Sequence, residues 1–291
     1  MNIIGHGKII NLLNKSIVRG AISQAYLFSG PEHLGKFTVA LNFAERLAGE
    51  NTEVNPDLII IKPEINDKKG IIKKSDIKIE QVRELIHKLR LRSVGEKCKL
   101  AIIDDADRLN KSAQNALLKI LEEPNDKIVL ILISKDDKKL LATLISRCQR
   151  IRFGLVSRGE LEKNVPEDQK NRKALIFWSL GRPGLMLKMM ENKKEIDSRK
   201  ETAMELKTLF NKNLMEKLVL AEILGKDVQK AIRSLNLWTV LLRENLLGRR
   251  VFIEDRQKCF KIIESVEKSL AWIKETNSNP RLILENLFLR F

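Results

Sequence analysis

A phosphate-binding loop is indicated by the spacing Gly-x-x-x-x-Gly-Lys, formed by Gly30, Gly35 and Lys36. In such a loop, backbone N–H groups at the start of a helix bind phosphate oxygens, and the lysine pairs with the outer phosphates. The apolar run at residues 25–28 precedes the loop, and a helix-period segment at residues 36–48 follows it. Because this is the strand–loop–helix context that the motif requires, the sequence predicts a phosphate loop by ancestry.

The same loop lacks the residue that holds a metal ion. Phe37 stands where a serine or threonine hydroxyl binds Mg²⁺ in a working site. Thr38 is one residue late, and one residue turns a side chain by about 100° around a helix. His33 stands where a glycine would ease the approach of phosphate to the backbone. We therefore expect a site that neither binds nor hydrolyses ATP usefully, although residual ATP binding stays open. The alternative is that the glycines only preserve a turn.

Two acidic residues, Asp104 and Asp105, follow the apolar run at residues 100–103. In a nucleotide site the first would hold Mg²⁺ through water, and the second would orient the attacking water. The second position normally needs a glutamate. Aspartate is one methylene shorter, and a displacement of about 1 Å can lower a rate about 100-fold. We therefore expect weakened hydrolysis here, the alternative being that these acids cap the next helix.

An arginine that could act on another subunit is Arg147, which lies between Ser146 and Cys148 before the last apolar run of the N-terminal half. At the edge of a nucleotide domain, a guanidinium can be delivered to a neighbour's site, where it stabilises the charge on a transferring phosphoryl group. The alternative for Arg147 is a local salt bridge. Cys148 is predicted to serve packing rather than nucleophilic chemistry, since no histidine lies near it in the sequence.

The elements that must position these residues alternate between short apolar runs and helix-period segments. This alternation predicts an α/β domain with a parallel sheet. The lysine- and aspartate-rich segment at residues 62–78 is predicted to be an exposed insertion. The apolar runs lie at residues 25–28, 58–61, 100–103, 128–133 and 151–153, and the intervening helices are predicted at residues 36–48, 80–91 and 112–121, the last stopped by Pro124.

After about residue 155 the strand pattern disappears and the chain is predicted to be helical. A break is expected at residues 181–184, and Asn279 followed by Pro280 predicts the start of the last helix. The fold class is therefore α/β plus α. We predict three domains, at residues 1–154, 155–193 and 194–291.

The composition limits the class of protein. The chain of 291 residues carries a formal net charge of +16, spread over both halves, and this is a footprint of nucleic-acid contact or of solvated helix faces. No apolar run approaches the ~18 residues of a membrane span. The N-terminal residues lack a signal-peptide pattern, and three scattered cysteines are typical of a reducing compartment, so we expect a cytoplasmic protein.

Several motifs together resemble the AAA+ subunits of the bacterial DNA polymerase III clamp loader, most closely its delta-prime subunits. The motifs lie at residues 25–31, 35–36, 112–124 and 146–148. The resemblance covers most of residues 1–190, whereas the remainder matches only in length and helical character. It implies a RecA-like AAA+ domain with a degenerate phosphate loop, a small helical lid, and a helical collar that holds a five-membered ring together.

The resemblance also implies roles for single residues. Arg147 matches the family's arginine finger, and Ser134 matches the sensor 1 position. The sensor 2 arginine falls at Gly184 and is therefore missing, unless Arg182 substitutes. The segment Ile4–Gly5 matches one that lines the adenine pocket. Many relatives carry a four-cysteine zinc module that has no counterpart here, so we predict no zinc.

These features together predict a non-hydrolysing, stator-like clamp-loader subunit that donates Arg147 in trans. Its expected partners are the motor AAA+ subunits and delta in the ring, the sliding clamp, and primer-template DNA through the complex, with no membrane. One alternative is an active motor subunit or a related DNA-processing ATPase. Another is a nucleic-acid-binding protein on a decayed phosphate-loop scaffold, which the positive charge would favour.

Overall fold

A computed structural model describes residues 3–49, 55–68, 71–91, 98–123, 128–248, 253–276 and 278–291. The chain divides into two compact units, Met1–Met190 and Glu191–Phe291. The predicted boundary at residue 154 lies inside the first unit and stays a prediction. The first unit contains all the predicted site residues.

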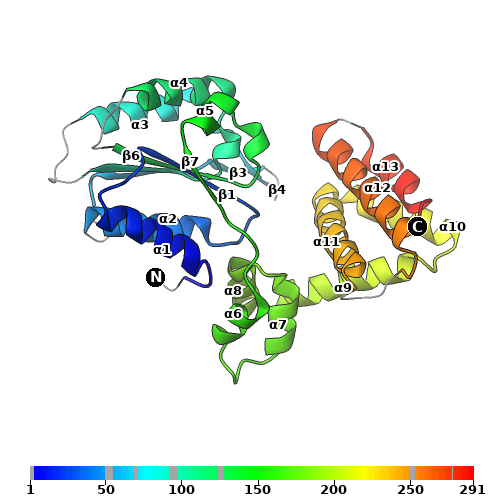
Figure 1. The fold of residues 1–291 in the computed structure, drawn as a ribbon. Coiled ribbons are helices and arrows are strands. Elements are labelled where there is room, and N and C mark those ends of the chain that lie inside the picture. The colour runs from blue at the N-terminus through cyan, green and yellow to red at the C-terminus, as the bar shows by residue number, and fades with distance from the viewer. Residues whose placement is uncertain are drawn as a thin grey trace. The chain divides into compact units, whose positions relative to one another are not determined.

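The first unit is built on a five-stranded parallel sheet with the strand order β2-β5-β6-β1-β7 (Figure 1). This confirms the predicted α/β class. The three central strands are buried along their whole length, as their runs of apolar residues require. The strands are β1 (Ala25–Ser29), β2 (Leu58–Ile61), β5 (Lys99–Ile103), β6 (Ile128–Ser134) and β7 (Gln149–Arg152).

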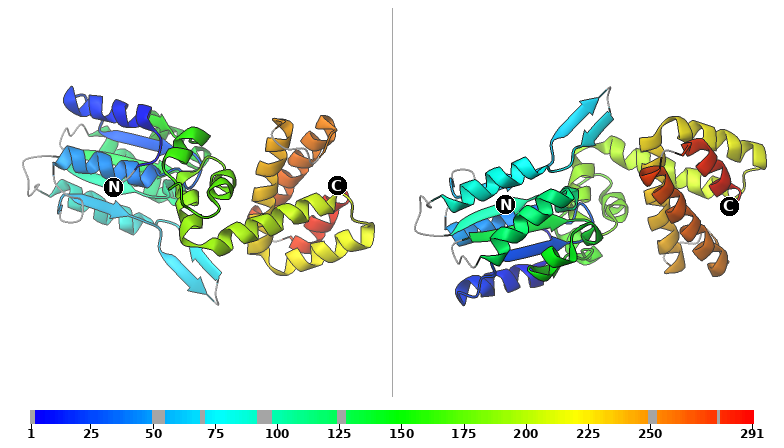
Figure 2. Two further views of the ribbon diagram at one scale, coloured as in Figure 1. Left: turned by 90° about the horizontal axis from the view of Figure 1, so that it is seen from below. Right: turned by 90° about the horizontal axis from the view of Figure 1, so that it is seen from above.

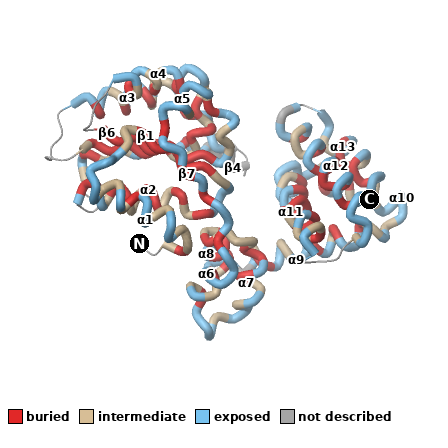
Figure 3. Tube along the Cα trace, in the orientation of Figure 1, coloured by how far each residue is buried: buried red, intermediate tan, exposed pale blue. Residues whose placement is uncertain are grey.

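Helices cover both faces of this sheet (Figure 1). α1 (Gly7–Val18) and α2 (Lys36–Ala48) lie on one face, and α3 (Ile79–Arg90), α4 (Lys111–Glu122) and α5 (Ala142–Ser146) lie on the other. Each helix turns its apolar side to the sheet, so that buried segments face inward and exposed segments face solvent (Figure 3). Pro124, predicted to stop α4, lies outside the described residues.

The predicted exposed insertion contains a β-hairpin that the sequence pattern did not indicate. β3 (Ile65–Lys68) pairs antiparallel with β4 (Ile71–Lys74), and the hairpin extends beyond the sheet (Figure 2). Ile77 returns the chain to the domain, because its N–H donates to Arg108 O at 2.9 Å. Lys74 at the end of β4 is therefore held close to the carboxyl ends of the central strands.

Three short helices complete the first unit. They are α6 (Arg158–Lys163), α7 (Arg172–Ser179) and α8 (Pro183–Glu191). The predicted break between α7 and α8 is present, with Gly181 at φ 76°. A Cβ at Gly181 would lie 2.9 Å from Leu155 Cβ, so this turn requires glycine on both counts.

The second unit is entirely helical among its described residues. Its core surrounds Trp238, which is fully buried and packs against Phe288 and Phe291. Asn279 accepts a hydrogen bond from Arg281 N at 2.9 Å, and Pro280 occupies the first turn of the last helix, as the sequence predicted. The helices are α9 (Lys193–Leu209), α10 (Leu214–Lys226), α11 (Val228–Leu246), α12 (Arg256–Glu275) and α13 (Pro280–Phe288). None of the helices among the described residues has both the length and the apolar character that a membrane crossing needs.

Candidate phosphate site and arginine finger

The phosphate loop follows β1 and leads into α2, at the carboxyl ends of the parallel strands. In open α/β sheets this edge is where ligands bind. Gly30 has φ 140°, and a Cβ there would lie 2.4 Å from Phe153 O. Gly35, at φ 81°, caps the start of α2 in the left-handed region. Both glycines are therefore needed for the shape of the loop, whatever it binds.

Lys36, the lysine of the motif, is turned back onto its own loop. Its Nζ donates to Gly30 O at 2.5 Å and to Pro31 O at 2.6 Å, and the residue is 7% exposed. Burial lowers the pKa of Lys36, and nearby carboxylates, led by Glu32, oppose this. The ammonium group is thus satisfied by the protein itself.

Phe37 occupies the position where a hydroxyl would bind the metal ion, and a lysine ammonium group lies over its ring. Lys62 Nζ lies 4.0 Å from the centroid of the Phe37 ring, a cation–π contact. Thr38 is half-buried in the first turn of α2, one residue beyond the required position. The Phe37 side chain has no oxygen to offer a metal ion.

The two acids at the end of β5 are also engaged within the chain. Asp104 Oδ1 accepts a hydrogen bond from Asp105 N at 3.0 Å, and burial, followed by the Asp105 charge, raises the pKa of Asp104. Asp105, at φ 50°, forms an ion pair with Lys74 of the hairpin. A lysine ammonium therefore neutralises the carboxylate that would orient the attacking water.

Ser134, at the sensor 1 position, is the last residue of β6 and hydrogen-bonds to the residues around the strand end. Its side chain is fully buried, and its Oγ donates to Asp107 Oδ1 at 3.4 Å. Asp107 also accepts from Lys135 N at 3.2 Å, and Asp136 N donates to Ser134 Oγ at 3.1 Å. The hydroxyl is thus held among protein groups at the strand end.

The loop presents few side-chain oxygens to the Mg²⁺ of a bound nucleotide. The metal needs hard oxygen ligands. The Phe37 side chain offers none, and Asp105 already has a cationic partner in Lys74. Among the residues that the structure describes, no three His, Cys, Asp or Glu side chains gather as metal ligands.

The helical segment that would form a lid touches the loop directly. Gly184 N donates to His33 O at 2.8 Å, and a Cβ on Gly184 would lie 3.0 Å from that oxygen. A larger residue at the sensor 2 position would therefore push the loop and the segment apart. Arg182 lies two residues earlier, and its buried Nε has no hydrogen-bond partner among the described residues.

Arg147 lies at the opposite edge of the sheet from the phosphate loop. It precedes β7, which runs parallel to β1, so it is at the amino end of a strand while the loop is at the carboxyl end. Four residues of strand separate these edges by about 13 Å. The side chain is 37% exposed. Arg147 therefore cannot serve the phosphate loop of its own chain.

The local salt bridge that was the alternative for Arg147 is present. Arg147 Nη2 donates to Glu122 Oε1 at 2.9 Å, and Nη1 donates to Thr143 O at 3.1 Å. An exposed ion pair of this kind contributes about 0–1 kcal/mol to stability, so the guanidinium can leave it at little cost. Ser146 Oγ donates to Thr143 O at 3.0 Å. Burial raises the pKa of Cys148 to about 12, which rules out a thiolate nucleophile at neutral pH.

Comparison with known proteins places these features in a family. The sequence model of the family described as DNA polymerase III, delta subunit matches residues 5–156, about half of the chain. The chain belongs to the DNA polymerase III delta subunit family. This confirms the resemblance to clamp-loader AAA+ subunits that the motifs indicated.

Individual relatives agree with the family match. The chain is 34% identical over 165 residues to DNA polymerase III subunit delta' of Bacillus subtilis (50% of this chain, 46% of that protein). It is 31% identical over 179 residues to subunit tau of the same organism (58% of this chain, 32% of that protein). The chain thus spans about a third to a half of the length of these relatives.

A solved structure supports the fold alone. A DNA polymerase III gamma subunit-related protein of Thermotoga maritima superposes with a TM-score of 0.51 at 20% identity. The match covers 97% of this chain and 96% of that one. The α/β unit followed by a helical unit is therefore an arrangement already seen in a solved protein.

In this member of the delta subunit family, Gln114 connects α4 to α5, the helix that Arg147 caps at its C-terminal end. Its buried Nε2 donates to Leu109 O at 3.0 Å and to Lys139 O at 3.2 Å, and its Oε1 accepts from Leu141 N at 2.7 Å. Leu141 is the N-cap of α5. A glutamine on the otherwise apolar face of α4 was the sequence signal for this role.

Four more residues shape the phosphate site and were missed by the sequence reasoning. Glu32 occupies one of the unrestricted positions of the loop motif, so the motif gives no signal for its role. Lys62, Lys74 and Lys135 come from segments whose approach to the loop depends on the tertiary fold. Motif spacing alone could not have found them.

The segment Ile4–Gly5, predicted to line the adenine pocket, packs against the protein. Ile4 is 5% exposed, and a Cβ on Gly5 would lie 2.7 Å from a methyl group of Val156. The next residue, His6, has Nε2 at 2.9 Å from Leu34 O, and its ring lies against Phe153 with centroids 4.9 Å apart.

His6 is expected to make stability fall in mild acid. Burial is the main cause that lowers the pKa of His6, with Lys36 acting in the same direction and the Leu34 carbonyl and Glu160 opposing it. The unfolded chain therefore binds the proton more readily, so the contribution of His6 is present above about pH 6.5 and is lost as the pH falls below it. Thermal unfolding of the full chain should show a smaller drop between neutral and mildly acidic pH in His6→Gln. The exposed His87→Gln is the matched control, and equal slopes for both variants would contradict this.

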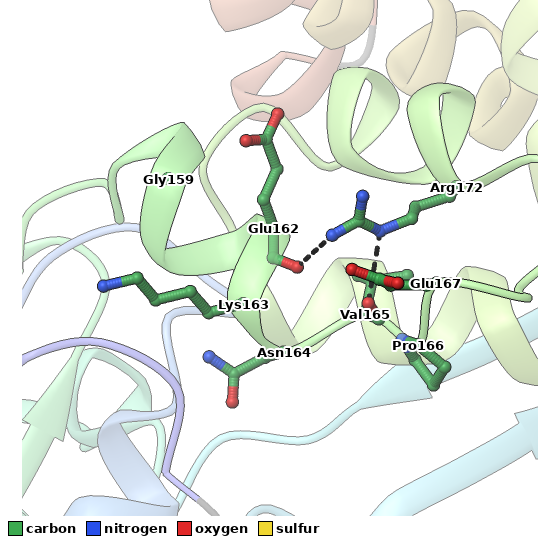
Figure 4. Close-up of a pocket in the computed structure, with 8 residues that line it drawn as sticks. All are labelled: Gly159, Glu162, Lys163, Asn164, Val165, Pro166, Glu167 and Arg172. Atoms are coloured by element: carbon green, nitrogen blue, oxygen red, sulfur yellow. Dashed lines mark hydrogen bonds between the residues drawn. The ribbon is translucent and has the colours of Figure 1, made fainter.

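A separate concave site lies in the helical segment and contains none of the predicted site residues. It is lined by α6, the following loop and Arg172 (Figure 4). Arg172 Nε donates to Val165 O at 3.2 Å, and Nη2 donates to Glu162 O at 2.6 Å. Because this guanidinium is satisfied by backbone carbonyls, its role is to fix the loop between α6 and α7.

Proposed function

We propose that this chain is a non-hydrolysing, stator-like subunit of a bacterial replicative clamp loader. The observation that carries the proposal is Phe37 with Lys62 on its ring, at the position where hydrolysis needs a metal-binding hydroxyl. The ion pair of Asp105 with Lys74 supports it, because it engages the second acid as well. The chain's contribution to catalysis is then made at another subunit's site.

That contribution is Arg147, donated in trans. The guanidinium lies at the sheet edge away from its own loop, is partly exposed, and has a weak partner in Glu122 that a stronger anion can replace. At a neighbour's site it would stabilise the charge on the transferring phosphoryl group. Ser146 and Cys148 fix the turn that presents it.

The helical second unit, the proposed collar, offers a surface for assembly. α10 is apolar on almost every side, and a helix of this type is normally covered. Its exposed apolar side chains are Leu214 (57%), Met215 (71%), Val219 (52%) and Ile223 (51%), with Leu282 (61%) of α13 nearby in the fold. We infer that it packs against other subunits of a five-membered ring, the motor AAA+ subunits and delta, which acts on the sliding clamp and primer-template DNA.

We further propose three domain roles and a cellular setting for this chain. Residues 1–154 form the AAA+ domain, residues 155–193 the lid and residues 194–291 the collar. The chain works in the cytoplasm without a zinc ion and without nucleotide turnover of its own. The remnants of a nucleotide site are then Gly30, Gly35, Lys36, Thr38, Asp104, Asp105 and Ser134.

Reconstitution tests this function. The motor and delta subunits of the same organism are mixed with sliding clamp and primed DNA, with and without the chain, and ATP turnover is measured. DNA-dependent turnover should require the chain, while the chain alone should hydrolyse no ATP. Full turnover without the chain, or turnover by the chain alone, would reject the proposal in favour of a dispensable DNA-binding protein or a motor.

Phe37→Ser should not restore hydrolysis to the isolated chain. The substitution supplies the missing hydroxyl, but Asp105 stays paired with Lys74 and no arginine stands at position 184. Turnover should therefore stay at the background of the parent chain in an ATPase assay with Mg²⁺. Recovery of hydrolysis by this single change would show that the site is far less degraded than its contacts indicate.

A further inference from the structure

Glu32 places a carboxylate inside the phosphate loop. Its Oε1 accepts a hydrogen bond from Lys135 Nζ at 2.7 Å, and the Glu32 side chain is 50% exposed. Lys135 follows Ser134 at the carboxyl end of β6, so the pair joins the loop to the strand beside β1. Burial raises the pKa of Glu32, but Lys135 and other nearby cations outweigh this and the pKa is lowered overall. The loop therefore contains its own anion.

Two further cations share Glu32 as a counter-charge. Burial lowers the pKa of Lys36, and Glu32 is the foremost charge that opposes this. Burial likewise lowers the pKa of Arg182, and Glu32 again opposes it. Of these three cations, Lys135 is the one with a hydrogen bond to Glu32 among the described contacts. Lys36 begins α2 and Arg182 precedes α8, and the Glu32 charge acts on both of them through space. Clusters of lysine and arginine around a glycine-rich loop are what phosphate groups bind.

Lysine side chains also lie at the two positions where a nucleotide site would hold its metal ion. The ammonium group of Lys74 pairs with Asp105, and that of Lys62 lies over Phe37. Lys74 is fixed from behind, because Arg108 Nη1 donates to Lys74 O at 2.7 Å. The hairpin thus supplies positive charge where a nucleotide site would use a divalent cation.

We propose that Glu32 is the residue that excludes phosphate ligands from this loop, its carboxylate serving Lys36, Lys135 and Arg182 as an internal substitute for a phosphate group. Lys74 is the matching substitute for the metal at Asp105. The hydrogen bond from Gly184 N to His33 O joins loop and lid directly, with no ligand needed between them. The inference deepens the proposed function, on whose nucleotide-free site it rests, by naming what keeps that site closed.

The test is binding of inorganic tripolyphosphate to the full chain in EDTA, measured by calorimetry. Glu32→Gln preserves the shape of the side chain and removes its charge, so the three cations lose their internal anion. The variant should bind tripolyphosphate at least about tenfold more tightly than the parent, because a fixed negative charge no longer repels the ligand. Its melting temperature should rise with tripolyphosphate, whereas that of the parent should not.

Glu84→Gln is the matched control, since Glu84 forms an exposed pair with Lys88 at the same distance of 2.7 Å. An equal gain in this control, or no gain in Glu32→Gln, would overturn the proposal. If Glu32→Gln does not fold, Glu32→Gln with Lys135→Gln removes both charges of the pair, and this double variant should still bind more tightly than the parent. No gain there would overturn the proposal too.

Anion binding to the chain alone is separate from ATP turnover by a neighbour. Failure of this test therefore leaves the role of Arg147 standing. Conversely, loss of the finger assignment would not alter what Glu32 does in the loop.

Discussion

Replacing Arg147 with alanine is expected to lower the DNA-dependent ATP turnover of the reconstituted ring about tenfold or more, within the range known for arginine fingers. The reason is chemical: no other group on this chain would supply a planar cation at the neighbour's transferring phosphoryl. Arg147→Lys should recover little of the loss, because an ammonium cannot bond in the two-pronged way of a guanidinium. Turnover at saturating ATP is the measurement.

The fold and the assembly should survive this change. The Arg147 side chain is exposed, and its pair with Glu122 contributes at most about 1 kcal/mol to stability. Arg150→Ala is the matched control: Arg150, in β7, is similarly exposed at 39% and pairs with Asp137 at 2.6 Å. If both alanine variants behave like the parent, Arg147 is a surface salt-bridge residue and the finger assignment fails.

Replacing Trp238 with alanine should unfold the helical second unit or leave it marginal. The side chain is fully buried against Phe288 and Phe291, and its Nε1 donates to Thr202 O at 2.9 Å. Truncating a buried tryptophan costs about 3–5 kcal/mol, and a unit of this size has only about 5–15 kcal/mol in total. Chemical denaturation should show an early transition for this unit, and ring assembly should be lost with it.

Trp272→Ala is the control, because Trp272 on α12 is 54% exposed. Its removal should change the unfolding free energy by no more than about 0.5 kcal/mol. Assembly by the Trp238→Ala chain as efficient as that of the parent would contradict the collar role of this unit. Trp272 lies among helix-period apolar residues, as Trp238 does, yet it is exposed. Periodicity identifies an apolar face but not whether the chain itself covers it.

The sheet was predictable because its central strands are buried on both faces. Runs such as residues 128–133 are entirely apolar, and such runs alternating with helix-period segments are typical of a parallel sheet covered by helices. β7 was misplaced by two residues because it is an edge strand, and Gln149 and Arg150 are exposed. The hairpin β3–β4 was missed because its lysines and aspartate carry no apolar alternation.

Part of the candidate site was predictable from the sequence and part was not. The loop glycines, Lys36 and the acids of β5 could be found because a local motif fixes their spacing. The lysines that pair with the acids of the site could not be found in this way. Lys74 is 31 residues from Asp105 in the sequence, and Lys135 is 103 residues from Glu32. Long-range ion pairs leave no spacing signature in the sequence. Glu32 lies within the loop itself, but at a position that the motif leaves open to any residue.

The most direct test of the central claim is a titration of the purified chain with labelled ATP and Mg²⁺, followed by a turnover assay on the same sample. We predict neither saturable binding nor turnover. Tight binding without turnover would leave the stator role in place but contradict the exclusion of phosphate by Glu32. Turnover near the ordinary enzymatic range, about 1 s⁻¹ or more, would contradict the account and make this chain a motor.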